Sequence, residues 1–183
     1  MESEDILIEL KQLSQNNKIK KSEIMEILKK YARIISVNDL MLATARMRKD
    51  GEYVQKNYRE KYLTVYIKYF IMRMKEVKEF EDYADKNIDK SSFDTSFPML
   101  ERTFEKERLS DAKDDKFPLI YVITALYTTF ILEEPIHPVG SEFPGSLFVE
   151  EKNGEFYCPV KDKQKDNINA ICHLCLAEQT PDI

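Results

Sequence analysis

Apolar residues recur every three or four positions through the first two thirds of the chain, which predicts amphipathic helices. The first carries Leu7, Leu10 and Leu13, the second follows Ser22 as a cap, and the third follows Asn38 as a cap. The longest helix should cover about 54–85, and two later helices should cover about 98–109 and 118–132. The expected fold class is mainly α, an irregular bundle of about six helices.

Two segments are apolar almost all round and should be central to this bundle. In the longest helix, residues 65–74 are interrupted only by Lys68 and Arg73, so this helix should run through the centre. The segment 117–132 is uncharged over sixteen residues. That is shorter than the roughly 18 residues expected of a membrane span, so we interpret it as a buried core helix.

Helix-breaking residues divide the chain into two unlike parts. Residues 1–97 contain no proline and one glycine, whereas residues 135–183 contain five of the seven prolines and three of the four glycines. This predicts a helical bundle at 1–135 and a small module at 136–183 packed on it. Within the module, Asn153-Gly154 separates the apolar runs 147–149 and 156–157, which is a strong β-hairpin signal. A short helix should follow near Asn167.

All three cysteines lie in the module, with spacing typical of a tetrahedral zinc site. Cys172 and Cys175 are three residues apart and would share a helix face, while Cys158 would come from the end of the hairpin. His137 is the candidate fourth ligand, because His173 would point about 100° away from Cys172 on a helix. We expect one structural zinc per chain, in a hairpin-plus-helix zinc module.

Other interpretations of the cysteines remain open. They could be ordinary buried residues, a Cys-x-x-Cys redox pair, or ligands of an iron–sulfur cluster, which usually has four cysteines. A catalytic zinc would need an open position and an acid–base group. The carboxylates near enough in sequence are Glu133, Glu134 and Glu178.

Charge and composition narrow the class of partner. The net charge of −5 argues against a general binder of nucleic acids or anionic membranes. If RNA binds, it should use the basic residues Arg46, Arg48, Lys49, Lys56 and Arg59. The acidic start does not resemble a signal peptide, and an odd number of cysteines suits a reducing compartment. We therefore expect a cytoplasmic protein without a membrane segment.

The C-terminal third also resembles a known family. The resemblance rests on 137–140 (HPVG), 157–164 (YCPVKDKQ), the Cys172-x-x-Cys175 pair and, more weakly, the helical segment from Asp39 to Pro135. The chain is similar to an uncharacterised archaeal family, chiefly of methanogens, known as a domain of unknown function. The resemblance implies an archaeal protein and assigns no catalytic residue.

Two classes of function follow from these residues. The first is a non-enzymatic protein, stabilised by zinc, that binds a protein or RNA partner. The alternative is a metal-dependent enzyme, of hydrolase or lyase type, with Glu133, Glu134 or Glu178 as acid or base. Neither the partner nor the oligomeric state follows from the sequence.

Overall fold

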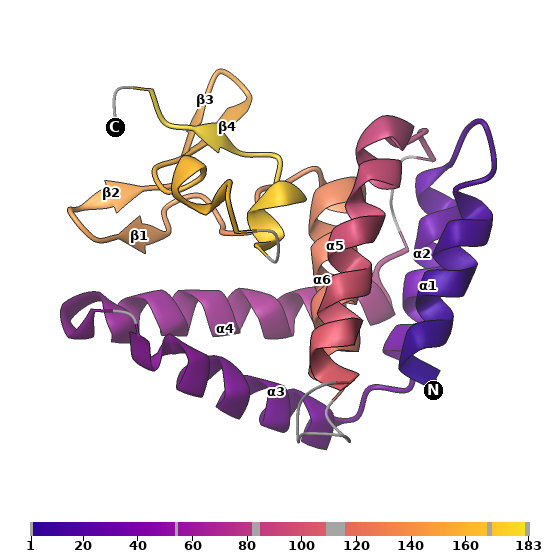
Figure 1. The fold of residues 1–183 in the computed structure, drawn as a ribbon, viewed down its shortest axis with the longest axis horizontal. Coiled ribbons are helices and arrows are strands. Elements are labelled where there is room, and N and C mark those ends of the chain that lie inside the picture. The colour runs from indigo at the N-terminus through magenta and orange to yellow at the C-terminus, as the bar shows by residue number, and fades with distance from the viewer. Residues whose placement is uncertain (1, 54, 82–84, 109–115, 168–169, 182–183) are drawn as a thin grey trace.

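The fold is mainly helical, with a few small strands near the C-terminus (Figure 1). The computed structural model describes residues 2–53, 55–81, 85–108, 116–167 and 170–181. Its α-helices are α1 (Glu2–Leu13), α2 (Lys21–Ala32), α3 (Val37–Asp50), α4 (Lys56–Glu79), α5 (Lys90–Arg108) and α6 (Phe117–Leu126). The expected mainly α class is confirmed.

Helix α6 lies at the centre of the bundle, since it contacts each of the other five α-helices. Eight of its ten residues are buried, including Leu119, Val122 and Leu126. It continues as a π-helix, η2 (Tyr127–Leu132), which is also largely buried. The interpretation of 117–132 as a buried core element is confirmed, and no helix among the described ranges is long and apolar enough to cross a membrane.

Helix α4 does not have the central place that we expected for it. Its buried positions repeat at intervals of four and three residues, which marks one apolar stripe rather than an apolar cylinder. Ile71 and Met72, on its other side, are 38% and 40% exposed. Together with α3 it extends from the bundle as a pair of helices (Figure 1). The stripe consists of Leu63, Ile67, Phe70, Met74 and Val77.

The starts of α2, α3 and α5 differ from the sequence prediction. Helix α2 begins at Lys21, before Ser22. Helix α3 is capped by Ser36 rather than Asn38, and the Ser36 hydroxyl accepts a hydrogen bond from the Asp39 N–H at 3.2 Å. The caps, Lys20 and Ser36, each lie two residues upstream of the predicted ones.

Helix α5 was predicted to start at Pro98, but Pro98 lies inside it. Asp89 accepts hydrogen bonds from the backbone N–H groups of Ser91 and Ser92, so the cap lies nine residues earlier than the proline. Phe93, in the extra turns, is fully buried against Phe130 with ring centroids 5.4 Å apart. Apolar packing on the core therefore outweighs the helix-breaking tendency of one proline.

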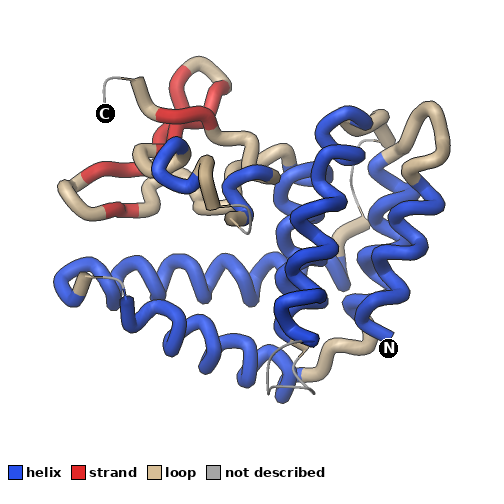
Figure 2. Tube along the Cα trace, viewed as in Figure 1, coloured by secondary structure: helices blue, strands red, loops and turns tan. Residues whose placement is uncertain are grey.

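The C-terminal segment forms two small sheets that lie over α4 (Figures 1 and 2). One pairs β1 (Glu142–Phe143) with β2 (Leu147–Phe148), antiparallel. The other has the order β3 (Glu150–Lys152), β4 (Glu155–Cys158), β5 (Glu178–Gln179), in which β4 and β5 are parallel. Short 3₁₀ turns, η1 (Gly51–Tyr53), η3 (Asp162–Gln164) and η4 (Ile171–His173), complete the elements.

The predicted hairpin is present, but with a different first strand. Asn153 and Gly154 have φ of 57° and 85°, as a tight I′-type turn requires. The strand that pairs with β4 is 150–152, whereas Leu147 and Phe148 belong to β2. The predicted helix near Asn167 is also wrong in extent, because the described residues from 170 onward form the 3₁₀ turn η4 rather than an α-helix.

One buried lysine closes the end of the central element. Lys21 is 6% exposed, and its Nζ donates a hydrogen bond to the carbonyl of Ile131 at 2.8 Å. The same ammonium lies 3.0 Å from the carboxylate of Glu133, whose φ of 56° ends the π-helix. Lys21 therefore satisfies a carbonyl at a helix end that would otherwise be buried without a donor.

We predict that Lys21→Met destabilises the protein by about 2–4 kcal/mol, because a buried carbonyl loses its donor and Glu133 loses its partner. Urea unfolding followed by circular dichroism measures this change. The control is Lys30→Met on the same helix, whose side chain is 62% exposed and pairs with Glu9. An exposed pair contributes at most about 1 kcal/mol. Equal effects of the two substitutions would contradict the assigned role of Lys21.

Candidate functional site

The three cysteines lie in two segments that β-pairing brings together. Cys158 is the last residue of β4 and is buried. Cys172 lies in η4 and Cys175 follows one turn later, with the Cys175 N–H bonded to the Cys172 carbonyl at 3.2 Å. In such a tight turn, residues three apart lie on the same side. The expected convergence of Cys172 and Cys175 thus holds without an α-helix.

The thiols are close enough to affect one another electrostatically. Burial raises the pKa of Cys158, and the nearby Cys175 raises it further. Burial also raises the pKa of Cys172, with added contributions from Cys175 and Cys158. A negative charge on one sulfur therefore disfavours a negative charge on the next. Without a compensating cation, these groups favour the neutral thiol form.

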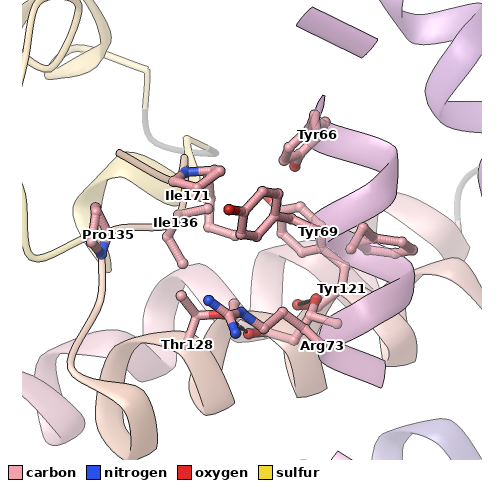
Figure 3. Close-up of a pocket in the computed structure, with 12 residues that line it drawn as sticks. Tyr66, Tyr69, Arg73, Tyr121, Thr128, Pro135, Ile136 and Ile171 are labelled. Atoms are coloured by element: carbon pink, nitrogen blue, oxygen red, sulfur yellow. Dashed lines mark hydrogen bonds between the residues drawn. The ribbon is translucent and has the colours of Figure 1, made fainter. Parts of the chain in front are cut away.

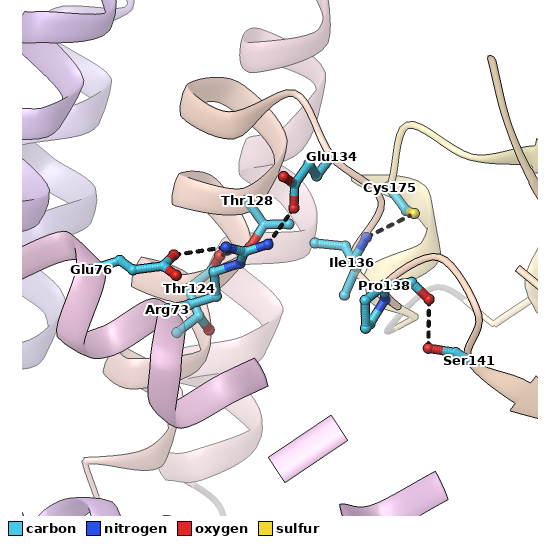
Figure 4. A network of polar contacts seen from close by, with 9 residues as sticks. All are labelled: Arg73, Glu76, Thr124, Thr128, Glu134, Ile136, Pro138, Ser141 and Cys175. Atoms are coloured by element: carbon cyan, nitrogen blue, oxygen red, sulfur yellow. Dashed lines mark hydrogen bonds and ion pairs between the residues drawn. The ribbon is translucent and has the colours of Figure 1, made fainter. Parts of the chain in front are cut away.

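Several donors are nevertheless directed at the sulfur atoms. The backbone N–H groups of Val160 and Lys161 form hydrogen bonds with Cys158 that lower its pKa. The Ile136 N–H donates to Cys175 Sγ at 3.3 Å (Figure 4). Because an N–H group stabilises a thiolate more than a thiol, these bonds favour the charged form.

Lys161, three residues after Cys158, binds the backbone of the turn that carries Cys172 and Cys175. Its Nζ donates to the carbonyls of Cys172 and Cys175 at 2.5 and 2.7 Å. Its charge also acts to lower the pKa of both Cys158 and Cys172. Lys161 lies in the YCPVKDKQ string, three positions after Cys158. Its closeness to that cysteine is visible in the sequence, but we assigned it no role there.

His137 lies at the same junction but contacts a tyrosine. Its Nε2 is 3.2 Å from the hydroxyl of Tyr62, and its ring centroid is 5.3 Å from that of Tyr66 and 5.4 Å from that of Phe143. Burial lowers the pKa of His137 to about 4, so the imidazole is neutral at pH 7. His173 is exposed, with Nε2 2.9 Å from the carbonyl of Asn167.

The side chains do not form a ready-made metal centre. Within the part of the chain that the structure describes, no three His, Cys, Asp or Glu residues are grouped so as to hold a metal ion. The assignment of Cys158, Cys172, Cys175 and His137 as ligands stays a prediction. So does the choice of zinc over an iron–sulfur cluster.

A cluster of tyrosines from α4 and α6 faces the cysteines. Burial raises the pKa of Tyr62 to about 12, with further contributions from Cys172 and Cys158. Burial and the influence of Cys172 also raise the pKa of Tyr66 and of Tyr121. The four-residue spacing of Tyr62 and Tyr66 places them on one side of a helix. That this side lies next to the cysteines follows only from the packing of the C-terminal segment on α4.

A small cavity adjoins this cluster, with a volume of about 30 Å³ (Figure 3). It lies between α4, α6 and the segment after the π-helix, and Tyr66, Tyr121, Arg73 and Ile136 contribute to its wall. This volume suits about one water molecule. It does not suit a substrate.

Two of the three candidate acid–base residues are engaged in ion pairs. Glu133 pairs with Lys21, and Glu134 pairs with Arg73, which also binds Glu76 at 2.7 Å (Figure 4). Glu178 lies in β5, opposite Tyr157. Glu133 and Glu134 thus serve the framework that holds the end of the central element, and a catalytic role for any of the three stays a prediction.

The basic residues named for RNA binding do not share one environment. The guanidinium of Arg46 lies over the ring of Phe117, 4.6 Å from its centroid. Arg59 donates to the carbonyl of Glu52. The other three, Arg48, Lys49 and Lys56, are exposed. RNA contact through this set stays a prediction.

Comparison with known proteins places the chain in a family. The family model of an uncharacterized protein conserved in archaea, DUF2115, matches residues 20–180. The chain belongs to this family. The resemblance drawn from the sequence is thereby confirmed, and nothing in the family description names an activity or a ligand.

The relatives are proteins of methanogens, and their matches cover 70–90% of the chain. A UPF0305 protein of Methanothermobacter thermautotrophicus is 34% identical over 164 residues, covering 88% of this chain and 97% of the relative. A UPF0305 protein of Methanocaldococcus jannaschii is 29% identical, covering 90% and 99%. One from Methanopyrus kandleri is 31% identical over 133 residues, covering 70% and 88%. No solved structure matches the chain.

Proposed function

We propose that the protein is a zinc-stabilised, non-enzymatic binding protein. One structural zinc, held by Cys158, Cys172 and Cys175, would join β4 to the η4 turn and fix the C-terminal module on α4. What supports this proposal is that Cys158 and Cys172 each lie near enough to Cys175 to feel its charge, and that backbone donors are directed at the sulfurs of Cys158 and Cys175. The three side chains would have to close further around the ion to hold it.

The electrostatics of the cluster supports a cation. Burial and the neighbouring sulfurs raise the pKa of Cys158 and of Cys172, so the thiolate forms of these two residues need a compensating charge. The N–H groups of Val160, Lys161 and Ile136 would form weaker hydrogen bonds with neutral thiols than with thiolates. Zinc bound to thiolates satisfies both conditions, because the ion supplies the charge and the donors orient the ligands.

His137 is the proposed fourth ligand. A ligating histidine usually gives its second ring nitrogen to a hydrogen-bond partner, which fixes the tautomer. The contact of Nε2 with the Tyr62 hydroxyl suits that second role and leaves Nδ1 as the ligating atom. Its neutral form at pH 7 is also the form that binds metal.

The proposed binding role is supported by apolar side chains on the surface of α3. Val37 and Met41 are 75% and 66% exposed, and their spacing of four residues places them on one side of the helix. Leu42, which is 50% exposed, lies about 100° further round the helix from Met41. Neighbouring exposed apolar side chains of this kind typically mark a protein interface. We propose a protein partner that covers this face of α3.

For the metal, we predict about one zinc per chain in protein purified with its cysteines reduced, since one tetrahedral site needs one ion. Elemental analysis gives the ratio, and X-ray absorption gives the ligand set. Cys172→Ser should lose the metal, and His173→Ala should keep it, because His173 faces the Asn167 carbonyl. Metal-free protein, or an equal zinc content in both variants, would contradict the proposal.

For stability, we predict that Cys172→Ser raises hydrogen exchange across 142–179 and leaves that of α1, α2 and α6 unchanged. The sheets are short and their core is small, while zinc binding contributes roughly 10 kcal/mol or more in small modules. The helices retain their own large core. Unchanged exchange in the module would show that the cysteines act only by packing.

For the binding surface, we predict that a photo-crosslinking residue in place of Met41 captures a discrete protein from a methanogen extract. The matched control is the same residue in place of the exposed Lys18, in the turn between α1 and α2. Crosslinks that nuclease treatment removes would indicate RNA instead. Equal patterns from both positions would contradict a specific surface on α3.

A further inference from the structure

A groove lies between one side of α4 and the segment 137–142, and both of these walls are described without a gap. Its volume is about 450 Å³, within the range of roughly 300–1,000 Å³ typical of small-molecule sites. It is larger than the cavity beside Arg73 and than a pocket of about 310 Å³ between α3, α4 and α5. The groove is therefore large enough for a whole small ligand.

Aromatic rings form part of its wall. Tyr62, Tyr66 and His137 line the groove, and each is partly buried. The ring centroid of Tyr66 lies 5.7 Å from that of Tyr62 and 5.3 Å from that of His137. Because the rings are packed against one another, they are held in place before a ligand arrives. Such a surface suits a ligand that is itself a flat ring.

A sheltered carboxylate lies in the same wall. Glu142 belongs to β1, whose pairing with β2 holds its backbone, and its side chain is 23% exposed. Among the described residues its ion-pair partner is Lys61, with Nζ 3.4 Å from Oε2. This is longer than the roughly 2.7–2.9 Å of a strong charge-assisted hydrogen bond, and the Lys61 side chain is 74% exposed. Glu142 therefore keeps acceptor capacity for N–H groups of a ligand.

Two more polar side chains lie on the wall that α4 contributes. Glu60 and Thr64 are exposed, and in the described ranges neither side chain forms a hydrogen bond or an ion pair. A carboxylate accepts hydrogen bonds and donates none when it is ionised. The carboxylates of Glu60 and Glu142 thus favour a ligand with N–H donors and disfavour one that carries a phosphate beside them.

We propose that this groove binds a nucleobase or its uncharged nucleoside, a flat ring that bears N–H donors. The ring would lie against Tyr66, and its N–H groups would donate to Glu142. Guanine suits this arrangement, because its ring N–H and its amino group are adjacent and match the two oxygens of one carboxylate. This role goes beyond the proposed zinc-stabilised function, since none of the cysteines lines the groove, and its test measures the ligand rather than the metal.

The test is a titration of the full chain followed by two-dimensional nuclear magnetic resonance, which gives the affinity and the place of binding. At least one of guanosine and cytidine should bind with a Kd of about 1 mM or tighter and shift backbone signals of 60–66 and 137–142. Benzyl alcohol lacks the N–H donors and ribose lacks the ring, so each should bind at least about tenfold more weakly. Guanosine monophosphate should bind no more tightly than guanosine, because its phosphate adds negative charge beside two carboxylates.

Variants locate the contact. Glu142→Gln should weaken binding by about tenfold or more, because the ligand loses a charged acceptor. The matched control is Glu150→Gln in β3, whose carboxylate pairs with Lys152 outside the groove, and it should leave the affinity unchanged. Thr64→Arg should also weaken binding, since the larger side chain occupies the groove. Thr64 is exposed, so this substitution keeps the test valid if the Glu142 variant does not fold.

Four results would overturn the proposal. The first is the absence of binding by both nucleosides at millimolar concentration, or shifts confined to other parts of the chain. The second is equal affinity for benzyl alcohol, which would make the groove an apolar surface without selection for N–H donors. The third is tighter binding of the monophosphate, which would indicate an anion site. The fourth is equal weakening by Glu142→Gln and Glu150→Gln.

Discussion

The arrangement of this protein depends on the need to bury one segment from every side. Residues 117–132 carry no charge, and helix α6 with its π-helical continuation exposes almost none of their surface. An element that is apolar all round cannot lie at the edge of a bundle, so other helices must surround it. Helices α1 to α5 do so, and each needs only one apolar stripe for that purpose. The protein thus consists of a central element and a shell around it, with Lys21 supplying the polar contact at the end of the centre.

Periodicity predicted the existence of the helices better than their ends or their places. The pattern of 117–132 indicated burial correctly, because a long uncharged run has few other solutions in a folded protein. In α4, the apolar run 65–74 led to the wrong prediction that this helix is central, since Ile71 and Met72 are apolar but exposed. Apolar side chains on a surface are common, so composition alone could not distinguish the two helices. Pro98 failed as a boundary because the packing of Phe93 on Phe130 is a tertiary effect, which no local pattern contains.

The spacing of the cysteines pointed to the candidate site, but the surroundings of these residues could not be predicted. The spacing of Cys158, Cys172 and Cys175 indicated that they would converge, and β4 and β5 bring the two segments together. The parallel pairing with β5 was missed, because two residues are too few to give a strand pattern. The contacts of Lys161 with backbone carbonyls, and of His137 with Tyr62, depend on long-range packing. For the same reason, the pocket between α3, α4 and α5 could not be found in the sequence, since Arg46 and Arg102, which line it, are 56 positions apart and meet only in the fold.

The parallel pairing of β4 with β5 also determines when the C-terminal module can form during synthesis. Glu178 and Gln179 are made some twenty residues after Cys158, and Thr180 donates its N–H to the Cys158 carbonyl at 3.1 Å. The surface of α4 that β1 contacts in the finished fold, including Tyr62, therefore stays uncovered while the rest of the chain is synthesised. The helices can pack before the module exists, but the module cannot close before β5 has emerged. Folding should thus proceed in one direction along the chain, and the segment that ends in Cys158 joins the segment of β5 in its last step.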